Sequence, residues 1–228
     1  MTSALTRMSH AAEDATDRLW AEYLAEDEGL VAQWESRPQS ETTVLAELSW
    51  RAERDQLVRQ LMFKALKTDG AKPGDAPFWW LRLKGRMDKI DEDNQAWLEQ
   101  HLDDTGWFTR SEYGEDAEKN AFLIVQHADG NIALQKRVLA MYESLLPKQE
   151  VLPEHYAELR DRVTAAENDV QRYGTQLECE SGELRLKAPL EDPDKVDQWR
   201  AEVGLPSLED YMSSASEEVG DCAALTGN

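Results

Sequence analysis

The stretch that decides the fold is "AFLIVQHADGNIALQKR", residues 121–137. An apolar run with helical spacing ends in Gln126 and His127, and the turn-forming sequence Asp129-Gly130-Asn131 separates it from a second amphipathic run. Apolar residues at every third or fourth position are typical of helices that bury one face. The stretch therefore predicts two consecutive helices, and it raises the question of what the amide and the imidazole at the end of the first helix contact.

The same period extends outward in both directions along the chain. It predicts helices at 11–35, 78–102, 116–128, 131–146 and 154–169. A further helix is expected to begin at a cap, either Ser40 or Thr42. Residues 103–116 read as a loop, and 68–77 as a linker because of their Gly and Pro content. Alternation of Leu and Cys with charged residues around "ESGE" predicts a β-hairpin at about 176–188, and a short helix is expected at 207–212.

These elements predict a mainly α fold, with a helical-bundle-like domain that carries a small C-terminal β-hairpin. We expect an N-terminal helical extension at 1–70, a helical domain with the hairpin at 71–212, and a flexible acidic tail at 213–228. The tail is small and polar, as terminal segments without a packed core commonly are.

Charge and composition exclude several classes of protein. The chain has 25 basic and 46 acidic residues, a net charge of −21, which argues against nucleic-acid and membrane-surface partners. The N-terminal stretch does not resemble a signal peptide, and no apolar run approaches the ~20 residues of a membrane span. We therefore expect a cytoplasmic protein.

Cysteine and histidine spacing predicts no metal site and no bound cofactor. Cys179 and Cys222 are far apart and belong to no Cys/His cluster, and the chain has neither a P-loop nor a dinucleotide-binding motif. A disulfide between the two cysteines is possible, although nothing in the sequence indicates it. A reduced setting is the default expectation for a cytoplasmic chain.

Several polar residues fall on helix faces that are otherwise apolar and are expected to be buried. Gln135 shares an apolar stripe in the helix at 131–146, Arg162 does so in the helix at 154–169, and His127 lies one turn beyond Leu123. Buried polar groups need hydrogen-bond partners. The irregular stretch "RYGTQ" at 172–176 adds a phenol, a hydroxyl and an amide. These groups either satisfy one another or face a shared ligand.

Each of these residues also has a structural interpretation. His127 could cap its helix or lie on the surface, and Gln135 could bond a neighbouring carbonyl. Arg162 could pair with Asp161 or Glu158 on a solvated face, or cross the core to Asp116 or Glu118. Tyr173 could be a core residue with an exposed hydroxyl. His155 lies on a charged amphipathic stretch and is predicted to be solvated.

From about 86 to 211 the chain resembles a bacterial family known only as a domain of unknown function. The resemblance rests on motifs whose order and spacing match over about half of the chain. They are Asn94, Gly106-Trp107, Gly114, Gln126-His127-Ala128-Asp129, Gln135, Arg162, Tyr173-Gly174-Thr175-Gln176 and "EDPDKVDQWRAEVGLPSLEDY" at 191–211. The resemblance implies a polar pocket formed by these residues but carries no activity over to this chain.

The first functional hypothesis is a polar small-molecule or peptide pocket built on His127 and Arg162, with or without catalysis. His127 would act as general acid or base, and Arg162 would bind a carboxylate or phosphate. The remaining candidate ligand-binding residues are Gln126, Gln135, Tyr173, Thr175 and Gln176.

Two alternatives remain open at the level of sequence. One is a non-catalytic acidic helical adaptor that binds a protein partner, in which the polar residues only fix the packing. The other is a leader-like protein whose C-terminal tail, with Cys222 and Thr226, is modified by a partner enzyme. The sequence does not predict an oligomeric state.

Overall fold

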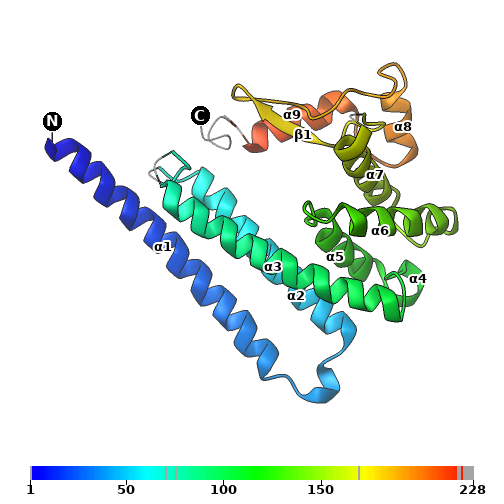
Figure 1. Ribbon diagram of the computed structural model, residues 1–228, viewed down its shortest axis with the longest axis horizontal. Coiled ribbons are helices and arrows are strands. Elements are labelled where there is room, and N and C mark those ends of the chain that lie inside the picture. The colour runs from blue at the N-terminus through cyan, green and yellow to red at the C-terminus, as the bar shows by residue number, and fades with distance from the viewer. Residues whose placement is uncertain (1, 70, 75, 169, 220–221, 223–228) are drawn as a thin grey trace. The chain divides into compact units, whose positions relative to one another are not determined.

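The computed structural model describes residues 2–69, 71–74, 76–168, 170–219 and 222, and it confirms the mainly α fold with a small β-hairpin near the C-terminus (Figure 1). The chain divides into two compact units, of which the first ends at Gln100 and the second begins at His101. No helix in the described ranges is long and apolar enough to span a lipid bilayer.

Unit 1 consists of helices α1 (Thr2–Glu35), α2 (Val44–Leu66) and most of α3 (Pro77–Asp104), with a 3-10 turn η1 (Gln39–Glu41) before α2. The cap of α2 is Thr43, whose hydroxyl accepts a bond from the backbone N–H of Ala46, so the expected cap at Ser40 or Thr42 is wrong. Thr43 is the residue directly before the first helical turn, where a side-chain oxygen can reach the free N–H groups. The apolar faces pack into a core that includes Trp20, Tyr23, Val58, Leu61, Trp79, Leu83 and Ile90.

Unit 2 contains shorter helices and the hairpin. They are α4 (Arg110–Tyr113), α5 (Glu115–Gln126), α6 (Ile132–Leu145), η2 (Leu146–Lys148), α7 (Pro153–Asn168), β1 (Leu177–Glu180), β2 (Glu183–Leu186), α8 (Val196–Glu202) and α9 (Leu208–Val219). The short helix α4 lies inside the segment predicted as a loop. A single turn has too few positions to show a helical period, so the pattern could not reveal it.

The hairpin follows the alternation seen in the sequence. Leu177 pairs with Leu186 and Cys179 with Leu184, and these four side chains share the less exposed face, while the intervening charged residues are exposed. Ser181 and Gly182 form the connection with φ of 54° and 87°. Two consecutive residues with positive φ suit the two-residue turns that join antiparallel strands.

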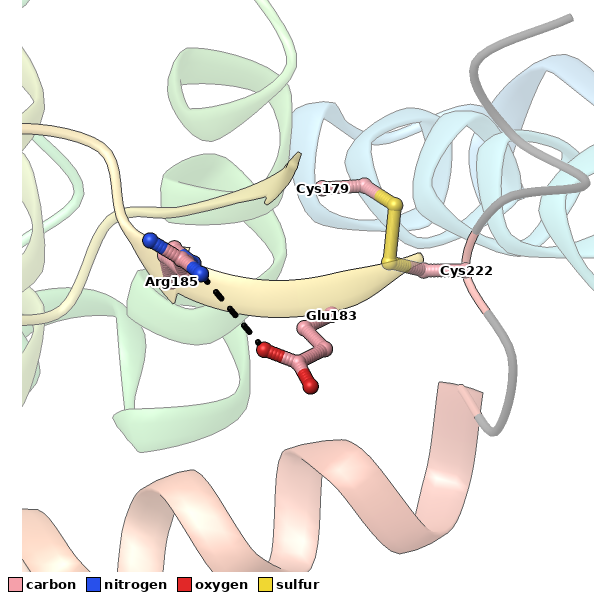
Figure 2. The surroundings of a disulfide bond; sticks show 4 residues. All are labelled: Cys179, Glu183, Arg185 and Cys222. Atoms are coloured by element: carbon pink, nitrogen blue, oxygen red, sulfur yellow. Dashed lines mark ion pairs between the residues drawn. A yellow bond between two sulfur atoms is a disulfide. The ribbon is translucent and has the colours of Figure 1, made fainter. Parts of the chain in front are cut away.

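Helix α9 extends beyond the end that the sequence predicts. It runs to Val219, so residues 213–219 of the expected flexible tail are helical, since Tyr211, Met212, Ala215 and Val219 keep one partly buried face. Cys222, which follows α9, forms a disulfide with Cys179 on β1 (Figure 2). The disulfide that the sequence left open is therefore present, while Thr226 lies outside the described residues.

A buried carboxylate connects three helices of unit 2. Glu118 on α5 accepts bonds from the hydroxyl of Tyr142 on α6 (2.7 Å) and from Nδ1 of His155 on α7 (2.9 Å). The His155 ring stacks on Phe122 with ring centroids 4.0 Å apart. The prediction that His155 is solvated is wrong, because its side chain is only 14% exposed and contacts Glu118 and Phe122 of α5.

Candidate functional site

A pocket of about 400 Å³ in unit 2 gathers residues from α5, α7, α9 and the hairpin. Its size is within the range of small-molecule sites, and nearly all of its lining side chains are polar or charged. The lining residues are Gln126, Asp129, Glu158, Arg162, Thr175, Gln176, Leu177, Lys187 and Tyr211.

The pocket depends on the irregular segment 172–176, which is shaped by Asp161. This carboxylate is fully buried on α7 and accepts bonds from the backbone N–H groups of Arg172 (2.8 Å), Tyr173 (3.0 Å) and Thr175 (3.1 Å). It also accepts a bond from the Thr175 hydroxyl (3.3 Å). An irregular segment lacks the hydrogen bonds of a helix or sheet, and Asp161 supplies the acceptor that this backbone needs.

Two further buried side chains hold the same segment from its other sides. The amide of Gln171 accepts a bond from the N–H of Gln176 (2.7 Å) and donates to the carbonyls of Gln176 and Ala188 (3.0 Å each). The guanidinium of Arg200 donates to the carbonyls of Tyr173 and Pro206. The segment therefore presents Thr175 and Gln176 to the pocket in a fixed orientation.

Gly174 is required by the course of this backbone. Its φ is +64°, and a Cβ at this position would lie 3.0 Å from Leu208 and 3.1 Å from Leu190. Residues with a side chain rarely adopt this conformation, and here the space is also occupied. The glycine thus allows the segment to pack closely beneath α9, whose Tyr211 hydroxyl donates to the carbonyl of Thr175 (2.9 Å).

The charged groups of the pocket are unequally shielded. Nη1 of Arg162 lies 2.5 Å from Oδ1 of Asp129, and the Arg162 side chain is 22% exposed while that of Asp129 is 74% exposed. Lys187 is an exposed cation on the rim. Glu158 is partly buried, and burial raises the pKa of its carboxyl group, against the lowering influence of His155 and Arg162. The interior of the pocket therefore offers a guanidinium and a carboxyl group that holds its proton more firmly than usual.

Replacing Glu158 with glutamine is expected to stabilise the protein at neutral pH. A carboxyl group whose pKa is raised in the folded state binds its proton more tightly there than in the unfolded chain, so folding stability falls as pH rises from the ordinary value of 4.5 through the raised pKa. The Glu158→Gln variant cannot ionise at this position, so its folding stability does not fall in this way. Denaturant unfolding across the pH range should show a stability gain above that window that disappears below it.

The matched control for this experiment is Glu143→Gln on the exposed face of α6. It makes the same change in net charge, so it reports the general effect of removing one acid from a chain with a charge of −21. A pH-independent gain at Glu158, or an equal gain in both variants, would contradict the expectation.

The residues predicted from sequence divide into two groups. Gln126, Arg162, Thr175 and Gln176 line the pocket. Gln135, Tyr173 and His127 are not among its lining residues. Gln135 is buried and donates from Nε2 to the Val125 carbonyl (3.1 Å), and the Tyr173 ring packs with Ala157 and Val203. His127 is the C-terminal cap of α5, where its backbone N–H donates to the Leu123 carbonyl.

Comparison with known proteins places the chain in a family. The model of one family of unknown function matches residues 41–221, which is most of the chain. The chain belongs to DUF6624. The match begins well before the region of about 86–211 in which the sequence motifs suggested a resemblance, so α2, α3 and the whole of the described unit 2 up to α9 fall within DUF6624. No curated protein and no solved structure matches the chain.

Membership of DUF6624 brings no activity with it, because the family is one of unknown function. It does mean that the pocket of unit 2 lies within the family region rather than in an appended segment. The function must therefore be inferred from the chemistry of the pockets.

Proposed function

We propose that the pocket of unit 2 binds a small polar molecule or a peptide end that carries a carboxylate or phosphate group. The observation that carries this proposal is the pairing of Arg162, inside the pocket, with a largely exposed carboxylate. An exposed ion pair contributes about 0–1 kcal/mol, so a ligand anion can replace Asp129 at little cost. The guanidinium then binds the anion with two parallel hydrogen bonds, the arrangement that arginine favours.

The other lining groups define the rest of the ligand. Glu158 accepts a bond from a donor when ionised and donates one when protonated, while the amides of Gln126 and Gln176 can do both. Lys187 at the rim adds a second positive charge. These groups suit a ligand that has an anionic end and a hydrogen-bonding or amino end, such as an amino acid or a dipeptide.

Binding by Arg162 is better supported than catalysis by His127. His127 follows Gln126 directly, but it caps α5 and is not a lining residue of this pocket. General acid or base chemistry needs the imidazole within hydrogen-bond reach of the reacting group. We therefore assign the pocket a binding role.

The experiment is a calorimetric titration of the protein with amino acids, glycylglycine and inorganic phosphate. The control ligand is glycinamide, which lacks the anionic group. We expect the anionic probes alone to saturate the wild-type pocket. Arg162→Met retains an apolar side chain without the charge, and it should weaken binding by about tenfold or more, which corresponds to ~1.4 kcal/mol.

The matched control is Arg185→Met on the exposed face of the hairpin, which removes the same charge outside the pocket and should leave the affinity unchanged. His127→Ala should also bind normally. Failure of all the anionic probes to saturate the wild type, or equal affinity in the Arg162 and Arg185 variants, would refute the proposal.

A further inference from the structure

A second pocket, entirely within unit 1, has a different chemistry. Its volume is also about 400 Å³, and its lining includes four basic side chains and two indole rings. They are Arg51 and Arg54 with Trp50 on α2, and Arg86 and Lys89 with Trp97 on α3. A concentration of cations stands out on a chain with a net charge of −21, and the same pocket is also lined by one acid, Asp93.

Two of the basic side chains of this pocket are positioned by a buried carboxylate. Asp27 on α1 is buried and is shared by two guanidinium groups: Arg54 Nε lies 2.7 Å from its Oδ1, and Arg86 contacts its Oδ2. Arg86 Nε also donates to the Tyr23 hydroxyl (2.8 Å). Asp27 balances one of these two cations, while Glu47 pairs with Arg51 (2.7 Å) and Asp93 pairs with Lys89 (2.9 Å), so the four cations retain one net positive charge.

The indole rings form flat walls around Arg51. The Arg51 guanidinium lies 5.7 Å from the Trp50 ring centroid and 5.0 Å from that of Trp97. Trp50 is fixed by a hydrogen bond from its Nε1 to the Leu30 carbonyl (3.2 Å). Aromatic faces next to a guanidinium favour ligands that combine a flat ring with a negative charge.

A buried donor without a partner marks the point where an acceptor would bind. The Asn94 side chain lines the pocket and the residue is 4% exposed. Its Oδ1 accepts a bond from Arg51 Nη1 (3.3 Å), and its Nδ2 has no hydrogen-bond partner among the residues that the structure describes. Because Arg51 can only donate, the amide cannot be reversed to satisfy Nδ2 without losing this bond. A buried, unpaired N–H group destabilises the folded protein, and a bound oxygen that accepts from it would remove this cost.

We propose that this pocket binds a small organic anion, in which an oxyanion group is attached to a flat ring. The oxyanion would accept bonds from Arg51 and from Nδ2 of Asn94, and the ring would pack against the tryptophan walls. The site is independent of the pocket in unit 2, because the two share no residue.

The test uses phenyl phosphate and benzoate as probes, with inorganic phosphate and phenol as their separate halves, monitored by tryptophan fluorescence and calorimetry. We expect phenyl phosphate or benzoate to saturate the protein and to bind about tenfold or more tightly than the matching half without a ring or without a charge. Absence of saturable binding by both probes would overturn the proposal.

Two variants locate the site. Asn94→Asp keeps the shape of the side chain and its acceptor for Arg51, but it replaces the free donor with a negative charge, so we expect at least about a tenfold loss of affinity. Asn120→Asp makes the same chemical change in unit 2 and should bind like the wild type. Lys89→Gln, at a position that is 62% exposed and does not threaten folding, should weaken binding severalfold.

Wild-type affinity in both Asn94→Asp and Lys89→Gln would refute this assignment. The Arg162→Met variant distinguishes the two proposals, since it should lose binding in unit 2 and retain phenyl phosphate binding in unit 1. If Arg162→Met lost binding of both sets of probes, the probes would be reporting one site. That result would refute the proposal of a separate site in unit 1.

Discussion

Asp161→Ala is expected to destabilise unit 2 by on the order of 3–5 kcal/mol, which is a large part of the stability of an ordinary domain. The variant removes the acceptor of three backbone N–H groups and one hydroxyl, all of them buried or partly buried. Each donor left without a partner away from water costs about 1–3 kcal/mol, less what the segment recovers by moving toward solvent. The pocket should be lost together with the segment.

Urea unfolding followed by circular dichroism measures this effect. The control is Asp194→Ala, which removes an exposed aspartate from the turn before α8. Asp161→Asn adds a second comparison, because it retains one acceptor oxygen but directs an NH₂ group toward backbone donors. We expect its stability to lie between those of the wild type and Asp161→Ala. An Asp161→Ala variant as stable as the Asp194 control would show that the segment does not depend on this carboxylate.

The helices were predictable because each buries one face over several turns. The period in "AFLIVQHADGNIALQKR" places α5 and α6 within one or two residues of their observed ends. Elements whose boundaries depend on single contacts were not predictable. The one-turn helix α4 is too short for a period, and the last turns of α9 have the small, polar composition that is also typical of a flexible tail.

The candidate site was predictable where a polar residue interrupts an apolar pattern. Arg162 interrupts the apolar face of its helix, and "YGTQ" interrupts the pattern between a helix and a hairpin, so the sequence indicates both. The sequence does not indicate the role of Asp161, because this residue lies between two arginines, and an acid in that setting is typical of a solvated helix face. Its role depends on backbone donors that approach from 11 to 14 residues along the chain.

Gln135 and Tyr173 show the limit of the same reasoning. Both are buried polar residues, as the sequence suggested, but their partners are within the protein: Gln135 bonds the last turn of α5, and Tyr173 packs under α8. A sequence pattern can indicate that a polar group is buried. It does not show whether a carbonyl of the same chain or a ligand will satisfy that group.

Breaking the disulfide is expected to destabilise the protein by about 4 kcal/mol. Cys179 and Cys222 are 43 residues apart, and a cross-link that closes a loop of this length removes conformational entropy of that order from the unfolded chain. Cys222→Ser, Cys179→Ser and chemical reduction of the wild type should each lower the free energy of unfolding by a similar amount. The double serine variant should match them and should not respond to the reductant.

The same bond should influence ligand binding in unit 2. It attaches the chain after α9 to β1, and α9 provides Tyr211, which lines the pocket and bonds the Thr175 carbonyl. Reduction loosens this attachment, so binding should weaken in reduced wild type and in both single serine variants, but further reduction should not change the double variant. Two titratable thiols in protein purified without reductant would contradict the pairing. Full stability and affinity after reduction would show that the hydrogen bonds of Asp161, Gln171 and Arg200 hold the pocket without the cross-link.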